Sequence, residues 1–152
     1  MDRGAVTAGS CVFCSIERGE TEAAIVFEDD ISFAILDHRP VFLGHTLLIP
    51  RAHHVTLPDL PAELVGPFFT NAQRITRAVQ VALEADGTFV AMNNVVSQSV
   101  AHLHVHVVPR RRKDGLRGFF WPRTKYPDRA TLDDVAERIR GALGGPARPG
   151  NI

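Results

Sequence analysis

Cysteine is scarce in this chain: the only cysteines among its 152 residues are Cys11 and Cys14, which are separated by two residues. A pair this close cannot cross-link distant parts of a fold, which excludes the disulfide framework of a small secreted domain. Long hydrophobic runs are also missing, since no stretch approaches the roughly 18 consecutive apolar residues of a membrane span. Residues 1–10 lack the apolar segment of a secretory signal. We therefore expect a cytoplasmic protein with no membrane partner.

The chain has no excess of charge of either sign. Its 17 Lys and Arg residues balance 17 Asp and Glu residues, and hydrophobic residues make up 45%. This composition is typical of a soluble globular domain and gives no reason to expect nucleic acid as a partner. With no internal repeat, the length suits one domain. We expect it over residues 11–143, with a flexible N-terminus at 1–10 and a flexible tail at 144–152.

Histidine, in contrast, is concentrated in one stretch, QSVAHLHVHVVPR at residues 98–110. His102, His104 and His106 alternate there with leucine and valine. A period of two predicts a half-buried β-strand with one apolar face and one face of imidazoles. Neighbouring imidazoles would lie roughly 6.5 Å apart, so all three cannot share one metal ion. At least one is left for nucleophilic or proton-transfer chemistry near neutral pH.

Hydrophobic periodicity predicts the other elements. A helical period indicates one long helix at Leu60–Leu83, and a short C-terminal helix is expected with Thr131 as its cap. Four more segments are apolar and β-prone: Ala23–Phe27, Ser32–Leu36, His45–Ile49 and Thr88–Met92. Without regular βαβ alternation, this order predicts an α+β fold with an antiparallel sheet of about five strands.

The Cys-x-x-Cys pair either binds metal or shuttles between thiol and disulfide. Redox chemistry favours a βαβ context, and the segments after the pair look strand-like instead, so metal binding is favoured. Tetrahedral zinc needs four nitrogen or sulfur ligands, and the pair supplies two. His53 and one member of the histidine row are candidates for the others. Such a closed site would be structural and would tie the N-terminal segment to the sheet.

Residues 110–125 hold seven basic residues against one Asp, with Phe119, Phe120 and Trp121 among them. Such a run is usually a solvated loop. Basic charge interleaved with aromatic rings also suits phosphates and bases, and it lies next to the histidine row. The run therefore slightly favours a substrate with a long phosphate chain.

Several separated motifs resemble the histidine triad (HIT) superfamily. HLHVHVV matches its His-φ-His-φ-His-φ-φ signature, where φ is apolar. The motifs CVFC, FEDD, LGHTLLIPRAH and QSV stand in the family's order, over about residues 11–110. The resemblance implies a HIT-like α+β fold and a homodimer whose sheets join across the interface. It also implies a nucleotide substrate, expected to contain adenine.

The resemblance further implies a role for particular residues. His104 would attack the α-phosphate, His106 would bind phosphate oxygens, and His45 and Ser99 would assist, Ser99 at a leaving amine. The nucleotide would be bound by Asp37 at the ribose, Phe13 and Ile16 at the base, and Asn93 (or Asn94) and Gln98 at phosphate. A structural zinc ion would be held by Cys11, Cys14, His53 and His102. Ser97 replaces the family's usual glycine before the glutamine.

These residues together predict a phosphohydrolase that acts through a covalent nucleotidyl-histidine intermediate. The substrate would be a dinucleoside polyphosphate or a nucleoside phosphoramidate, and the product a nucleoside monophosphate. His106 argues against the uridylyltransferase-like branch of the family, which has glutamine at that position. The alternatives are a nucleotidyl transferase or phosphorylase of the same family, and a zinc-stabilised module that binds nucleotides or proteins without catalysis.

Overall fold

The structure is a computed structural model that describes residues 8–117 and 123–143. The chain divides into two compact units, residues 1–114 and 115–152, and each is described by itself. A single domain over 11–143 stays a prediction. Of the predicted flexible N-terminus, the described part is one turn of 3-10 helix, η1 (Ala8–Ser10). The predicted tail and the aromatic residues at 119–121 lie outside the described residues.

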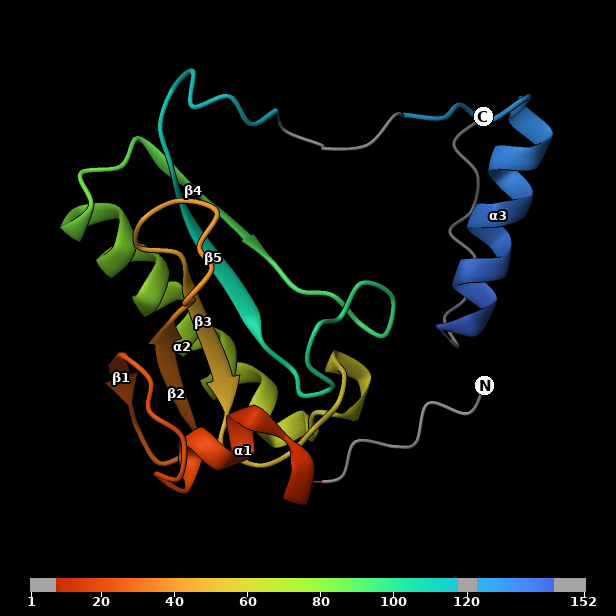
Figure 1. Ribbon diagram of the computed structural model, residues 1–152. Coiled ribbons are helices and arrows are strands. Elements are labelled where there is room, and N and C mark those ends of the chain that lie inside the picture. Colours follow the sequence, from red (N-terminus) through yellow and green to blue (C-terminus); the bar gives the residue numbers. More distant parts are fainter. Residues whose placement is uncertain (1–7, 118–122, 144–152) are drawn as a thin grey trace. The chain divides into compact units, whose positions relative to one another are not determined.

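The first unit is built on a five-stranded antiparallel sheet (Figure 1). Its strands are β1 (Ile25–Glu28), β2 (Ser32–Leu36), β3 (Thr46–Pro50), β4 (Gly87–Ala91) and β5 (Val105–Arg110). They lie in the order β1-β2-β3-β5-β4, so β5 is inserted between β3 and β4. The α+β prediction is confirmed, and the first four strands lie within two residues of their predicted bounds.

One face of the sheet packs against the long helix α2 (Ala62–Ala82) (Figure 1). The apolar side chains that α2 buries recur at helical spacing: Phe68, Ala72, Ile75 and Val79. They share a core with Leu103, Val105 and Val107. Burying one side chain the size of valine, leucine, isoleucine or phenylalanine stabilises the fold by about 1.5–3 kcal/mol. A short 3-10 helix, η2 (Leu57–Asp59), precedes α2.

The other face of the sheet is covered by a helix that the sequence did not predict, α1 (Val12–Glu17). The strand-like segments expected after the cysteine pair are β1 and β2, which follow this helix in the chain. Six residues are too few to show a helical period and too few to form a stable helix alone. α1 is stabilised by burial instead: Phe13, Cys14 and Ile16 join a second core cluster with β2 and β3.

The histidine strand is shorter than predicted. β5 begins at Val105, so His106 lies within the sheet while His102 and His104 come just before it. The upstream chain leaves the strand ladder, because the Leu103 N–H donates to the His54 carbonyl instead. The alternation itself persists, since Leu103, Val105 and Val107 all pack in the α2 core.

The second unit contains α3 (Arg129–Ala142). Its cap is Asp128, whose carboxylate accepts a 2.7 Å hydrogen bond from the Thr131 N–H, so the prediction of Thr131 as the cap was wrong. Asp128, in extended conformation, satisfies one N–H group of the first turn, so the helix is capped three residues earlier than expected. Within the described residues, no helix is long and apolar enough to cross a membrane.

Candidate functional site

A cleft of about 400 Å³ lies between α1 and the sheet. Its apolar part is formed by Phe13 and Ile16 from α1 with Leu47 from β3, and its polar part contains Asp37, Ser99, His104 and His106. A volume of several hundred cubic ångströms suits a nucleotide-sized ligand. The structure thus brings six of the predicted site residues together around one cavity. Thr21 and Glu22 also line the cleft, although no motif had pointed to them.

Two predicted phosphate-binding residues, Asn93 and Gln98, are not among the residues that line this cleft. The Asn93 side-chain amide donates to the Ser97 carbonyl at 3.1 Å. The Gln98 amide nitrogen donates to the Val55 carbonyl at 2.6 Å, and its oxygen accepts from the Val95 N–H at 3.0 Å. Both side chains hold the loop in shape, and their contact with phosphate stays a prediction.

The same loop has an unusual backbone. Val95 and Ser97 have φ angles of 70° and 60°, in the left-handed region that favours glycine. Such residues cost of order 1–3 kcal/mol each and persist only where their surroundings hold them. Asn94 adds one further restraint, because its side-chain oxygen accepts a 2.7 Å bond from the Leu57 N–H.

His104 has its proton placed by the backbone. Its side chain is 2% exposed, and its Nδ1 lies 2.7 Å from the His102 carbonyl oxygen. A carbonyl only accepts, so Nδ1 carries the hydrogen and donates it, and Nε2 keeps its lone pair. Burial lowers the pKa of His104, which keeps the ring neutral at pH 7. A neutral imidazole with an available lone pair is the form a nucleophile requires.

A relay of hydrogen bonds orients His106. The Val41 N–H donates to His45 Nδ1 at 3.2 Å, so the His45 hydrogen is on Nε2. His45 Nε2 donates in turn to His106 Nδ1 at 2.9 Å. The remaining hydrogen of His106 is therefore on Nε2, which makes this atom a hydrogen-bond donor.

Both rings of the relay are neutral near pH 7. Burial lowers the pKa of His45 despite the Asp37 carboxylate 3.7 Å away, and the neighbouring His104 lowers it further. Burial also lowers the pKa of His106 to about 4, with smaller contributions from His104 and His45. The contact between Asp37 and His45 is therefore not an ion pair at neutral pH. A neutral N–H donor can stabilise negative charge on a phosphate oxygen without giving up its proton.

Four predicted metal ligands converge on the far side of His104. The ligand atoms of Cys11, Cys14, His53 and His102 all lie within 4.8 Å of one another. Cys11 Sγ is 3.4 Å from His102 Nδ1, and Cys14 Sγ is 3.3 Å from His53 Nδ1. Tetrahedral zinc, with bonds of about 2.3 Å to sulfur and 2.0–2.1 Å to nitrogen, separates these atoms by roughly 3.6 Å. The cluster thus has the donors and spacing to hold a metal ion.

Protonation also fits a metal site at this cluster. His102 Nε2 donates to the Pro50 carbonyl at 2.8 Å, so its Nδ1 lone pair faces the sulfur atoms. Burial, followed by hydrogen bonding with Cys11, raises the pKa of the Cys14 thiol to about 11. A bound cation would reverse this effect by favouring thiolate. His53 directs Nδ1 to Cys14 Sγ, while its Nε2 is buried with no hydrogen-bond partner among the described residues.

Arg110 and Arg111 begin the basic run at the end of β5 and are not among the residues that line the cleft. Arg110 closes β5, six residues beyond His104, which corresponds to roughly 20 Å of extended chain. The Arg110 guanidinium binds the Asp114 carboxylate, and Arg111 donates to the carbonyls of Leu83 and Glu84. These contacts engage the guanidinium groups of Arg110 and Arg111 within the fold, and the preference for a long phosphate chain stays a prediction.

Comparison with known proteins agrees with this geometry. The family model of the HIT domain matches residues 18–113. A HIT-like protein of Mycobacterium tuberculosis is 44% identical over 108 residues, covering 70% of this chain and 75% of that protein. An adenylylsulfatase of Arabidopsis thaliana is 36% identical over 108 residues, covering 70% of this chain and 55% of that protein. An adenosine 5'-monophosphoramidase of Saccharomyces cerevisiae is 35% identical over 119 residues, covering 76% of this chain and 73% of that protein.

Solved structures show the same fold. The SMU.412c protein of Streptococcus mutans superposes with a TM-score of 0.82 at 32% identity, covering 94% of this chain and 91% of that chain. A zinc-bound histidine triad family protein of Mycobacterium smegmatis superposes with a TM-score of 0.68 at 39% identity, covering 87% of this chain and 99% of that chain. The fold and the matched sequence together show that this chain belongs to the HIT family.

Proposed function

We propose that this protein is a hydrolase that cleaves adenylyl compounds at the α-phosphate and releases AMP. The observation that carries the proposal is the Nε2 lone pair of neutral, buried His104 beside a nucleotide-sized cleft. Two relatives are named for adenylyl substrates, an adenylylsulfatase and an adenosine 5'-monophosphoramidase. In both of these substrates, AMP is joined to a small leaving group. We therefore favour a phosphoramidate or an adenylyl sulfate over a dinucleoside polyphosphate as the substrate of this protein.

In the proposed reaction, His104 Nε2 attacks the α-phosphorus while the bond from phosphorus to the leaving group breaks. The positive charge that forms on the ring is stabilised by the Nδ1–H bond to the His102 carbonyl. His106 Nε2–H donates to a non-bridging oxygen, where negative charge develops. Ser99 passes its hydroxyl proton to a departing amine, and the water that attacks in the next step returns a proton to Ser99. Water then attacks phosphorus, the P–N bond breaks, and His104 recovers its lone pair as AMP leaves.

The cleft provides separate places for the parts of the nucleotide. Phe13 and Ile16 form an apolar wall for the base, and Asp37 accepts hydrogen bonds from the ribose hydroxyls. Asn93 and Gln98 contact phosphate in this proposal after exchanging their present bonds within the loop.

A structural zinc ion completes the proposed site. It would be held by Cys11, Cys14, His53 and His102, which leaves no open position for catalysis. When bound it cross-links the start of α1 to the segments that follow β3 and precede β5.

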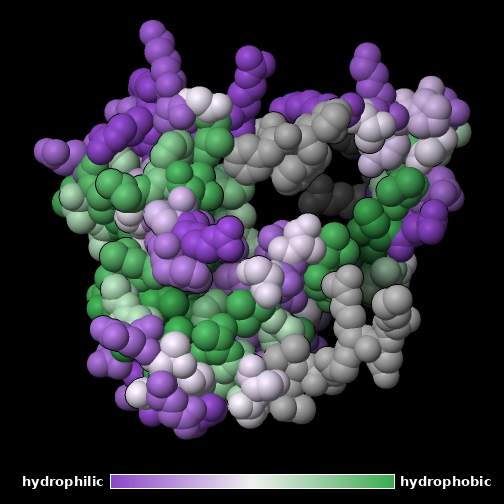
Figure 2. Space-filling view, in the orientation of Figure 1, coloured by the Kyte–Doolittle hydropathy of each residue, from purple (hydrophilic) through white to green (hydrophobic). Residues whose placement is uncertain are grey.

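The proposed assembly is a cytoplasmic homodimer whose sheets join at β4, an edge strand. Hydrophobic side chains remain on the surface of the first unit, as the green areas of Figure 2 show. Val90 on β4 is 44% exposed, and Val81 in the last turn of α2 is 77% exposed. Sheet-edge pairing in a dimer would satisfy unpaired backbone groups and cover part of this apolar surface.

Intact-mass measurement after quenching in alkaline denaturant tests the mechanism directly, because the P–N bond of a nucleotidyl-histidine survives in base and is hydrolysed in acid. Incubation with adenosine 5'-phosphoramidate or adenylyl sulfate should add the mass of one AMP group minus water, and His104→Ala should show no added mass. Thermal melting of the variant shows whether it is folded. Turnover by folded His104→Ala would refute the proposal, and tight binding without turnover of any substrate would identify a binding module instead. Formation of ADP in added phosphate would identify a phosphorylase.

A further inference from the structure

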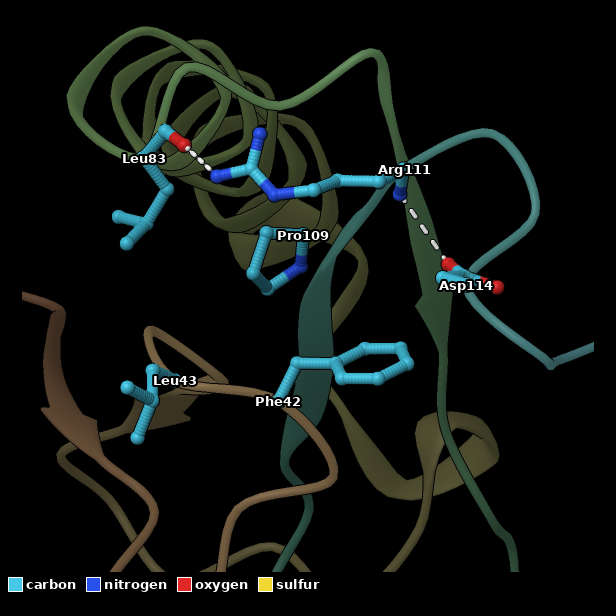
Figure 3. Close-up of a pocket in the computed structure, with 6 residues that line it drawn as sticks. All are labelled: Phe42, Leu43, Leu83, Pro109, Arg111 and Asp114. Atoms are coloured by element: carbon cyan, nitrogen blue, oxygen red, sulfur yellow. Dashed lines mark hydrogen bonds between the residues drawn. The ribbon is translucent and has the colours of Figure 1, made fainter.

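Arg111 holds the C-terminal end of α2. Its Nη1 donates to the Glu84 carbonyl at 2.6 Å and its Nη2 to the Leu83 carbonyl at 2.5 Å. In Figure 3 the guanidinium extends from the end of β5 across Pro109 to Leu83. These carbonyls have no partner within the helix, and a cation at this end also interacts favourably with the helix dipole. Arg111 thus fixes the position of Leu83.

Leu83 in turn packs against Gly44, the residue before His45. Gly44 has a φ of +94°, and a Cβ at this position would lie 2.8 Å from Leu83 Cγ. The side chain of Leu83 therefore rests directly on the backbone of Gly44. Any shift of Leu83 changes the support of this backbone.

The loop that Leu83 supports also sets the proton of His45. The Val41 N–H donates to His45 Nδ1, and the His45 N–H donates to the Phe42 carbonyl at 3.0 Å. Next to this loop is a hollow of about 400 Å³, lined by Phe42, Leu43 and Leu83, among others (Figure 3). Leu43 is 81% exposed, so the hollow gives this side of the loop little packing. Support from Leu83 matters more as a result.

We propose that Arg111 and Leu83 are positioning residues for the relay from Val41 through His45 to His106. Arg111 holds Leu83, Leu83 holds Gly44, and the loop then keeps the hydrogen of His45 on Nε2. The inference rests on the proposed function, because orienting His106 Nε2–H matters only if that atom binds the reacting phosphate. It assigns to Arg111 a role other than the phosphate contact that its basic neighbours suggested.

The state of the two rings can be measured without turnover. Long-range ¹H–¹⁵N spectra of ¹⁵N-histidine-labelled protein distinguish the two tautomers of each ring. In the wild type, His45 and His106 should both show hydrogen on Nε2. Arg111→Gln should move both rings toward averaged tautomers, and Arg111→Lys should restore part of the wild-type signal because lysine can still donate to one carbonyl. Arg112→Gln is the matched control, since it removes the same charge from the adjacent position. Among the described residues, the hydrogen bond of Arg112 is made by its backbone N–H, to Asp86 Oδ2.

Kinetics should show the same pattern. We expect Arg111→Gln to lower kcat by about tenfold, because an incorrectly oriented donor loses part of its stabilisation of the transition state. KM should change less than about twofold, since the cleft walls are distant from Arg111. Leu83→Ala should act like Arg111→Gln, while Leu83→Met, which conserves volume, should act like the wild type.

Two results would overturn the inference. One is a wild-type tautomer spectrum in a folded Arg111→Gln protein, and the other is equal loss of activity in Arg111→Gln and Arg112→Gln. If no variant or wild-type protein turns over nucleotide, the proposed function fails, yet the spectra still show whether Arg111 controls the two rings.

Discussion

Loss of the metal cluster should destabilise the protein and widen the base pocket. His53→Asn removes one of the four candidate ligands. α1 has six residues, fewer than the roughly 12–15 that an isolated helix needs, so its position depends on burial and on the cluster. Release of α1 exposes Phe13 and Ile16, now 5% and 8% exposed. At about 1.5–3 kcal/mol for each side chain, the expected loss is roughly 3–6 kcal/mol of unfolding free energy.

The same change should raise KM more than it lowers kcat. Phe13 and Ile16 form the apolar wall of the cleft, whereas the Nδ1–H bond of His104 to the His102 carbonyl does not involve His53. A displaced wall weakens the binding of the substrate and of the transition state equally. Such a loss raises KM and leaves kcat nearly unchanged. KM for the phosphoramidate should therefore rise with a smaller change in the rate at saturation.

Urea unfolding, metal analysis and steady-state kinetics of purified protein test this prediction. The control is His54→Asn, an adjacent histidine outside the four-residue cluster. Wild-type protein treated with a strong chelator should behave like His53→Asn. Equal urea midpoints and equal KM values for the two variants, both containing metal, would show that the cluster supports neither α1 nor the cleft.

Four further outcomes are expected. Ser99→Ala should slow hydrolysis of a phosphoramidate more than that of adenylyl sulfate, measured as the ratio of kcat/KM values, because only the amine needs a proton to leave. Burial lowers the pKa of His106 from its ordinary 6.5 to about 4, so the unfolded chain binds this proton first as the pH falls. His106 should therefore contribute a loss of roughly 2–3 kcal/mol of unfolding free energy between those pH values, measured in urea series of wild type and His106→Gln. Phe68→Ala should cost about 3–5 kcal/mol by the same method, because the ring is 1% exposed in the α2 core. Gly44→Ala should lower the melting temperature and kcat together, since its φ of +94° and the 2.8 Å approach to Leu83 leave no room for a methyl group.

Periodicity was sufficient to predict most of the sheet and the long helix. β2 lies at its predicted bounds, and α2 begins at Ala62, within two residues of the expected start. These elements bury a regular stripe or a continuous apolar run, and that pattern is visible in the chain alone. α1 has no such pattern. Its helical form depends on burial against β2 and β3, which are distant in sequence, so local propensity could not reveal it.

The residues of the cleft were also largely predictable, while their hydrogen-bond partners were not. Motif spacing led to His45, His104 and His106, and the structure places all three near the same cavity or in its relay. The partners that set their protons are the backbone groups of Val41 and His102. Every residue has such groups, so no side-chain pattern can show which of them faces a histidine.

Different hydrogen-bond partners explain how three alternating histidines could take the three different roles proposed for them. His102 directs Nε2 to the Pro50 carbonyl and leaves the Nδ1 lone pair facing the candidate metal site. His104 directs Nδ1 to the His102 carbonyl and leaves the Nε2 lone pair for the proposed attack on phosphorus. The tautomer of His106 is set instead by the hydrogen bond that its Nδ1 accepts from the His45 side chain. Because only this third arrangement depends on another side chain, the donor function of His106 should be the most sensitive to substitutions outside the cleft, and Arg111 is the place to test it.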